Sequence, residues 1–221
     1  MKNIRMTRGA VVGLFVLCAG AIAQETTTVS PDSGRWKICQ DRTIVWNIEE
    51  SVAAGLPLPH RDHLEMSGEQ VSCVLRYGVD GERGSELNRS MVWPMLRTVP
   101  DNTHASLMIR FDFDIPSGLK VDGKPLGKET VTEMIIPGGE LTCHSRFAVE
   151  NGELEVVHTL FPSMTQPMLC ERYTVTNRTD RVISLEVPEV RIENRTEAAR
   201  GVNGSYTTLV AVQNAGTTTL N

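Results

Sequence analysis

The stretch "LTCHSRFAVENGELEVVHTLF", residues 141–161, carries the pattern that decides the fold. Two runs with strand-forming residues flank Asn151-Gly152, and both runs lack the 3.6-residue period of a helix. Asn-Gly is favoured in tight β-turns because both residues readily adopt positive φ. We therefore predict an antiparallel hairpin that turns at Asn151-Gly152.

Strand patterns continue on both sides of this hairpin. In residues 70–80, "QVSCVLRYGVD", every second residue is apolar, which is typical of a strand with one buried face. Residues 105–116 alternate in the same way and stop at Pro116. Only residues 47–59 could form a short helical turn, which Gly55 and Pro57 would end.

Two further hairpins and a last strand complete the pattern. Residues 118–127 contain Asp122-Gly123, another favoured turn pair. Residues 171–187 predict two strands joined by a turn at 177–180, and residues 205–213 predict the last strand. Eight or more strands connected mainly by hairpins predict an all-β fold, an antiparallel β-sandwich.

The N-terminal residues predict the compartment in which the protein is found. Lys2, Arg5 and Arg8 precede an apolar run that ends at Ala23, which is the pattern of a secretory signal peptide. The run is shorter than the roughly 20 residues of a membrane span, and no later stretch approaches that length. We expect a signal peptide at 1–23, cleavage between Ala23 and Gln24, and a periplasmic or extracellular protein without a membrane span.

The remaining chain divides into a lead-in at 24–43 without strong periodicity and a β-sandwich domain at 44–221. Loss of the three basic leader residues lowers the formal net charge from −5 to −8. This negative net charge argues against nucleic acid and anionic membranes as partners. The last predicted strand is followed directly by residues 214–221, so we expect the sandwich to be an incomplete portion of a longer protein.

Four cysteines follow the leader: Cys39, Cys73, Cys143 and Cys170. An even number in an exported chain is compatible with two disulfides, for which three pairings exist. Buried apolar thiols are equally compatible, because the chain is long enough to form its core without cross-links. The sequence leaves both possibilities open.

Several familiar motifs are absent or incomplete. Residues 118–124 read G-x-x-x-x-G-K, but Pro125 replaces the Mg²⁺-binding Ser or Thr and no helix follows, so the hairpin interpretation is preferred. The sequence has no G-x-S-x-G, H-E-x-x-H or C-x-x-C motif. We therefore expect no cofactor and no metal site.

Asp112 and Asp114 form the first carboxylate pair of interest. Two residues of strand place their α-carbons roughly 6.5 Å apart, near the separation of about 6.5–9.5 Å of inverting glycosidases. Catalytic carboxylates must flank the scissile bond, whereas neighbours on one strand point the same way. We interpret this pair as part of a solvated strand face.

The polar stretch before residue 70 supplies the main candidates for ligand binding or an interface. In an extended segment His63 and Glu65 share one face, where an imidazole beside a carboxylate could transfer a proton or bind a sugar hydroxyl. A metal would need a third ligand from His60, and Glu69 is a further polar candidate. Trp93 could stack on a sugar, but aromatic residues make up only 5% of the chain, which favours a core or interface anchor. His104, His144 and His158 lie in or beside predicted strands and are interpreted as structural.

Three segments carry a resemblance to a known group: 61–80, 91–108 and 171–187. They resemble the N-terminal β-sandwich of exported bacterial glycoside hydrolases of the six-hairpin type. In that group a super-sandwich similar to galactose mutarotase precedes an (α/α)6 catalytic barrel. The resemblance covers roughly 44–213 and consists of strand patterns. It implies a carbohydrate ligand and a barrel partner that carries the catalytic acids, so no catalytic residue is transferred to this chain.

The leading hypothesis is a non-catalytic β-sandwich portion of an exported glycoside hydrolase, whose 60–69 stretch reaches the rim of the barrel's active site. Two alternatives remain open. One is a stand-alone glycan-binding module that depends on Trp93. The other is a mutarotase-like or lyase-like enzyme with His63 and Glu65 as its acid and base.

Overall fold

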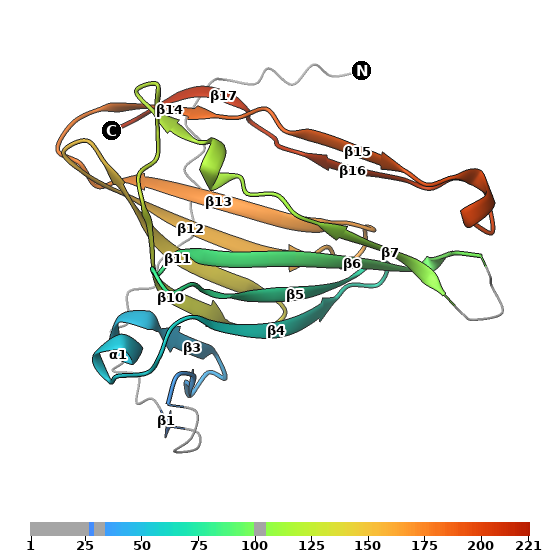
Figure 1. Cartoon of the computed structure of the whole chain (residues 1–221), viewed down its shortest axis with the longest axis horizontal. Helices are drawn as coiled ribbons and strands as arrows, with labels where there is room; N and C mark the ends of the chain where they lie inside the picture. The colour runs from blue at the N-terminus through green and yellow to red at the C-terminus, as the bar shows by residue number, and fades with distance from the viewer. Residues whose placement is uncertain (1–26, 29–33, 100–104) are drawn as a thin grey trace, which may run out of the picture.

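The computed structural model describes residues 27–28, 34–99 and 105–221, and it is built almost entirely of strands (Figure 1). Its elements are β1 (Thr27–Thr28), β2 (Lys37–Ile38), β3 (Ile44–Asn47), α1 (Ile48–Ala53), β4 (His60–Ser67), β5 (Ser72–Val79), β6 (Ser85–Arg97), β7 (Ser106–Phe111), η3 (Pro116–Gly118), β8 (Lys120–Val121), β9 (Lys124–Pro125), β10 (Glu129–Ile136), β11 (Leu141–Val149), β12 (Gly152–Pro162), β13 (Leu169–Asn177), β14 (Ile183–Val187), β15 (Arg191–Arg195), η4 (Ala198–Arg200), β16 (Thr207–Ala211) and β17 (Gly216–Leu220).

The strands form three sheets and one two-stranded arm, in which every neighbouring pair is antiparallel. Sheet A has the order β1-β2-β3-β10-β11-β12-β13, sheet B the order β4-β5-β6-β7, and sheet C the order β17-β14-β8-β9. The pair β15 and β16 forms the arm. The prediction of an all-β antiparallel sandwich is confirmed.

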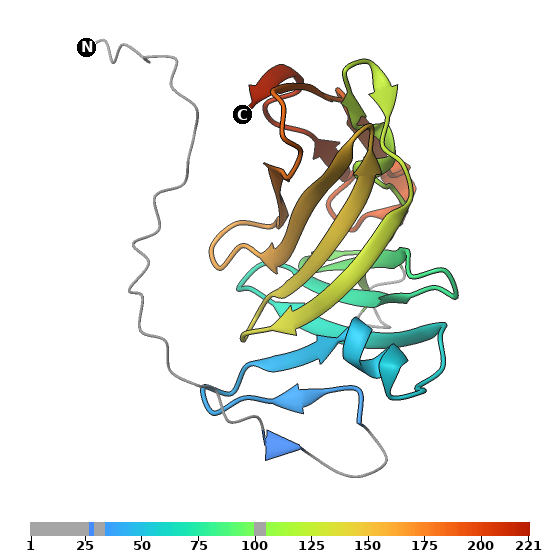
Figure 2. The same cartoon turned by 90° about the vertical axis from the view of Figure 1, so that its left-hand side faces the viewer.

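Sheets B and C both pack on one face of sheet A. In β11, Leu141 and Cys143 join the core shared with sheet B, whereas Phe147 joins the core shared with sheet C. Residues with the same parity lie on one face of a strand, and the pairing of β11 with β12 is continuous. Figures 1 and 2 show the gold strands of sheet A reaching from the teal strands of sheet B to the strands at the C-terminal end. The inner face of sheet A is therefore shared by two hydrophobic cores.

The tight turns lie where the sequence predicts them. Asn151 has φ 64° between β11 and β12, and Asp122 and Gly123 have φ 50° and 79° between β8 and β9. These left-handed values suit Asn, Asp and Gly, which explains the choice of residues. The short helix α1 is also confirmed: Asn47 accepts a hydrogen bond from the Glu50 N–H, which caps its first turn.

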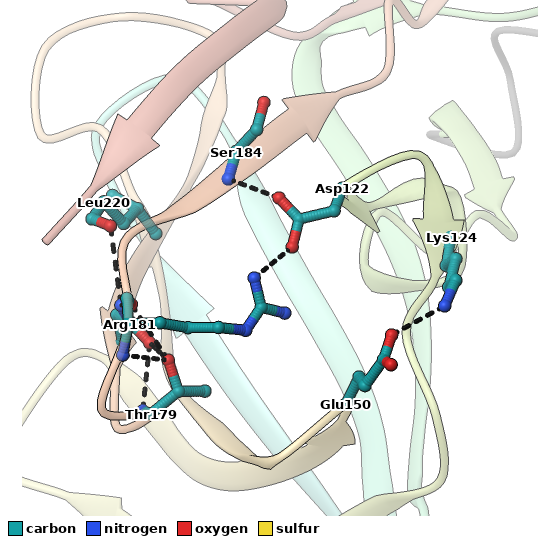
Figure 3. A network of polar contacts seen from close by, with 8 residues as sticks. Asp122, Lys124, Glu150, Thr179, Arg181, Ser184 and Leu220 are labelled. Atoms are coloured by element: carbon teal, nitrogen blue, oxygen red, sulfur yellow. Dashed lines mark hydrogen bonds and ion pairs between the residues drawn. The ribbon is translucent and has the colours of Figure 1, made fainter.

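The predicted hairpin at 171–187 is wrong, because its two strands belong to different sheets. β13 pairs with β12 in sheet A, while β14 pairs with β8 and β17 in sheet C. The Asn177 side chain holds this arch: its carbonyl oxygen accepts from the Thr179 N–H and hydroxyl, and its amide donates to the Arg181 and Leu220 carbonyls. Figure 3 shows the arch beside Asp122, which accepts from Arg181 and from the Ser184 N–H. The chain does turn at 177–180 as predicted, but this turn connects strands of two different sheets.

The two ends of the sandwich also differ from the prediction. Residues 205–213 do not supply the last strand, because β17 follows and pairs with β14 along its whole length. The lead-in contributes β1 and β2 to sheet A, and Trp36 packs its ring 5.5 Å from that of Trp46 in the core. The arm returns to sheet B, where the Tyr206 hydroxyl donates to the Arg97 carbonyl at 2.6 Å.

The remaining sequence predictions concern the signal peptide, His104, a membrane span and the cysteines. The signal peptide at 1–23 and His104 lie outside the described residues. Within 34–99 and 105–221, no helix is long and apolar enough to cross a membrane. Cys39, Cys73, Cys143 and Cys170 are free thiols in this structure; the first three are buried, as the thiol alternative expects, whereas Cys170 is partly exposed.

Candidate functional site: a polar cavity between two cores

A cavity of about 340 Å³ lies between the two hydrophobic cores, where the inner face of sheet A turns polar. We call it the inter-core cavity. Its walls come from β5, β6, β10 to β13 and the segment after β7. The polar residues that line it include Ser85, Arg89, Asp112, Asp114, Glu129, Ser145, His158 and Tyr173. Its volume falls within the range of small-molecule sites, roughly 300–1,000 Å³.

Arg89 of β6 and Glu171 of β13 form a buried ion pair beside this cavity. Arg89 is only 2% exposed, and its Nε and Nη2 both donate to the Glu171 carboxylate, the second at 2.8 Å. The remaining Nη1 donates to the Phe113 carbonyl at 3.0 Å, and the guanidinium lies 4.0 Å from the centre of the Phe113 ring. A planar, bidentate pair of this kind joins sheet B to sheet A with fixed geometry.

His158 and Tyr173 complete the shell around Glu171. His158 Nε2 and the Tyr173 hydroxyl lie 2.9 and 3.0 Å from the same carboxylate oxygen, and the two rings stack 4.0 Å apart. Burial opposes the negative charge of Glu171, but hydrogen bonds from His158 and Arg89 outweigh it and lower its pKa to about 2. An ionised carboxylate can only accept hydrogen bonds, so His158 Nε2 carries a proton in this arrangement.

A second carboxylate, Glu129 of β10, is also fully engaged. One of its oxygens accepts from the Ser145 hydroxyl at 2.7 Å, and the other accepts from the N–H and hydroxyl of Ser85 at 2.9 and 2.7 Å. These contacts tie β10, β11 and the start of β6 together. The wall of the cavity is therefore held by hydrogen-bonded polar groups from both sheets.

Asp112 and Asp114 lie at the edge of the cavity. β7 ends at Phe111, so these residues follow the strand and do not form part of its face, which corrects the sequence interpretation. Both are exposed, in agreement with the predicted solvation. Neighbouring protein atoms and the negative charge of Glu129 raise the pKa of Asp114.

Three inner groups, Glu171, Tyr173 and Cys143, keep one protonation state around neutral pH. Glu171 stays ionised, and burial raises the pKa of the Tyr173 hydroxyl, so it stays protonated. Burial also raises the pKa of the Cys143 thiol to about 12, which removes it as a nucleophile. The constant charge of Glu171 and Tyr173 suits a binding role for these two residues, since acid and base catalysis needs a pKa near the working pH.

The candidates from the 60–69 stretch lie elsewhere. His60 contacts the Asp62 carboxylate at 3.0 Å and packs edge-on against Trp46, and Trp36 donates to the same carboxylate. His63 and Glu65 share one face of the edge strand β4, as predicted, and both are exposed.

The side chains on that face of sheet B point away from the inter-core cavity, because the alternate residues of β4, such as Met66, point into the core. Glu69 is exposed in the β4 to β5 connection, where its N–H donates to the Met164 carbonyl. In the described residues, no group of three or more His, Cys, Asp or Glu side chains could hold a metal ion.

Trp93 is a core residue. Its side chain is 8% exposed, its indole N–H donates to the Pro167 carbonyl at 2.8 Å, and its ring packs edge-on against Phe111. No open ring face is available for a sugar, so the core-anchor alternative describes its place in this structure. Replacing Trp93 would therefore change the stability of the core.

The sequence did not point to Arg89 or Glu171 as site residues. The signal was nevertheless present: Arg89 has the same parity as Met91 and Trp93, and Glu171 has the same parity as Tyr173 and Val175. A charged residue in the buried phase of a strand must find a partner, because an unpaired buried charge is costly. Its partner lies 82 residues away, a separation that only the pairing of the sheets reveals.

Comparisons with known proteins add no relative. The chain matches no protein-family model, no curated protein and no solved structure. Its function is therefore inferred from the sequence and the geometry described above.

Proposed function

We propose that this chain is a non-catalytic, carbohydrate-binding β-sandwich that forms part of an exported glycoside hydrolase. The observation that carries the proposal is the inter-core cavity, which combines exposed carboxylates at its edge with a wall of hydrogen-bonded polar groups. Carboxylates and aromatic rings are the groups that bind sugar hydroxyls and sugar faces. The resemblance of the strand patterns to the six-hairpin glycoside hydrolases supports the same ligand class.

The binding role is tested by replacing Asp112 and Asp114 with Asn in one double variant. We expect its affinity for a neutral oligosaccharide, found by screening a glycan panel, to fall about tenfold or more, because charged hydrogen bonds to the sugar are lost. Isothermal titration calorimetry measures this change. Asp180→Asn, an exposed carboxylate in the β13 to β14 arch, is the matched control. Equal affinities for the wild type and the double variant would contradict the proposed site.

A partner domain is supported by exposed methionines around Trp93. Met95 is 75% exposed two residues after Trp93, and Met164 and Met168 are 66% and 50% exposed in the connection whose Pro167 binds the Trp93 indole. Large apolar side chains gathered at one place are typical of a surface that another domain covers.

The partner domain is tested in two steps. The complete gene should continue in frame into a helical barrel. Hydroxyl-radical footprinting should then oxidise these methionines more slowly in the whole protein than in residues 24–221 alone, and equal rates would argue against a covering domain.

We do not propose catalysis by His63 and Glu65. They lie on the exposed outer face of sheet B, on the side opposite to the cavity. This placement instead puts His63 beside a second feature of the surface.

A further inference from the structure

The outer face of sheet B carries an open depression of about 500 Å³. Arg61, Arg76 and Arg110 line it together with Glu86 and Asn88. The strand register explains how four strands meet there: Arg61 and Glu86 both pair with Gly78, Arg76 pairs with Asn88, and Arg110 pairs with Ser90. Directly opposite residues share a face, so these side chains all lie on the outer side of the sheet.

The depression is positively charged although the chain as a whole has a formal net charge of −5. Among the residues that the structure describes, Glu86 is the only carboxylate that lines it, and Arg61 donates both of the guanidinium hydrogen bonds to this carboxylate. The hydrogen bond from Arg61 and the weaker field of Arg76 lower the pKa of Glu86, so this pair stays ionised. Arg76 and Arg110 remain as exposed cations, and His63 lies directly opposite Arg76 in the register.

We propose that this depression binds the carboxylate or sulfate groups of an acidic oligosaccharide, with Arg76 and Arg110 as the cationic contacts and Asn88 as a hydrogen-bonding contact. The inference rests on the proposed carbohydrate-binding function and names the ligand class of a second subsite. Guanidinium groups bind planar and tetrahedral oxyanions through paired N–H donors. A nucleic acid or an anionic bilayer would extend its charge well beyond the depression, and the negative net charge of the chain repels it. A short acidic glycan needs only the depression itself.

The test uses residues 24–221 and three probes of equal length: a galacturonate oligomer, a sulfated oligosaccharide and a neutral oligosaccharide. Affinities are measured by calorimetry at low and physiological salt. The double variant Arg76→Ala/Arg110→Ala should bind at least one acidic probe about tenfold or more weakly, because two charged contacts are lost. Its affinity for the neutral probe should not change. Arg172→Ala, an exposed arginine on the outer face of sheet A, is the matched control and should behave as the wild type.

The outcomes distinguish the acidic-glycan subsite from the proposed carbohydrate-binding function. Loss of acidic-glycan binding in the double variant alone supports the inference, and the probe that is affected identifies a carboxylate or a sulfate as the ligand group. Acidic-glycan binding that is the same in wild type and double variant overturns the inference but leaves the proposed function intact. A wild-type protein that binds none of the three probes contradicts both. Thermal melting of each variant establishes that it is folded before its affinity is compared.

Discussion

At the scale of single residues, the Arg89 and Glu171 pair is the most consequential contact of the molecule. We expect Arg89→Met to lower the free energy of unfolding by about 3–5 kcal/mol, because Glu171 would keep its buried charge without its main partner. Urea unfolding at pH 7 measures this loss. Arg172→Met, at an exposed position next to Glu171, should change stability by less than about 0.5 kcal/mol. A loss below about 1 kcal/mol for Arg89→Met would show that the pair does not hold the two sheets together.

A double replacement separates the charge from the shape of the site. Arg89→Met combined with Glu171→Met removes both charges and leaves apolar side chains between the cores. Buried ion pairs are often replaced by apolar residues at little net cost, so we expect this variant to be more stable than Arg89→Met alone. The same unfolding experiment checks it. Equal instability of both variants would mean that packing, and not charge, dominates at this position.

The acid stability of the protein depends on the same carboxylate. The folded pKa of Glu171 is about 2, against an ordinary value of 4.5, so its contribution to stability is complete above pH 4.5 and is lost as the pH falls toward 2. The loss over that window amounts to about 3 kcal/mol. Glu171→Gln should lack this part of the pH dependence while sharing the rest. Urea midpoints between pH 5.5 and pH 2.5 test it, and parallel curves for the two proteins would contradict the assignment.

Local sequence patterns predict the contacts of neighbouring residues but not those between residues far apart in the sequence. His63 and Glu65 were expected on one face of a strand, and they lie there because alternation depends only on local geometry. The Arg89 cluster depends on three strands that meet across two sheets, and no local pattern encodes that meeting. The parity of charged residues within buried strands would have revealed that a partner was needed, although not which one.

At the scale of elements, Gly78 makes the close pairing of β4 with β5 possible. A Cβ atom at this position would lie 2.2 Å from the His60 carbonyl oxygen and 2.8 Å from the Arg61 Cα, which are backbone atoms that cannot move aside cheaply. We expect Gly78→Ala to destabilise the protein by about 1–3 kcal/mol. Gly81→Ala is the control, since nothing lies within 4 Å of its added Cβ. Thermal unfolding of both variants measures the difference, and equal melting temperatures would refute the close contact.

The elements also show how far a strand pattern can be trusted. The hairpin at 141–161 was predictable because Asn151 and Gly152 readily adopt the positive φ that a tight turn needs, and the two runs are the right length to pair with each other. The segment 171–187 has the same appearance, with two runs and a polar turn, yet its strands enter different sheets. A turn sequence specifies a change of direction, whereas the hydrogen-bond partner of each strand is decided by the sheet that is available. The extra strand β17 was missed for a related reason: its threonine-rich sequence has no apolar face, and only pairing with β14 defines it.

At the scale of the whole molecule, the modification rate of the buried thiols measures how often the folded protein opens. Burial raises the pKa values of Cys73 and Cys143 to about 12, and Cys39 is also buried, whereas Cys170 is partly exposed. We expect a thiol reagent at pH 8 to modify Cys170 in the folded protein and the other three only on unfolding. Peptide mapping by mass spectrometry at increasing urea concentration measures the order. Fast modification of Cys73 in the absence of urea would mean that sheet B separates from sheet A in the native state.

The shared inner face of sheet A has a consequence for the order in which the protein is made. The ribosome completes β4 to β7 before it adds β10 to β13, the strands that cover the apolar side of sheet B. The apolar side chains of sheet B, among them Leu75, Met91 and Leu107, therefore stay uncovered until about sixty further residues have been synthesised. In sheet C only β8 and β9 precede sheet A, whereas β14 and β17 are made after β10 to β13 are complete. The nascent chain is thus most exposed to aggregation midway through its synthesis, and a chaperone would have most to protect at that stage.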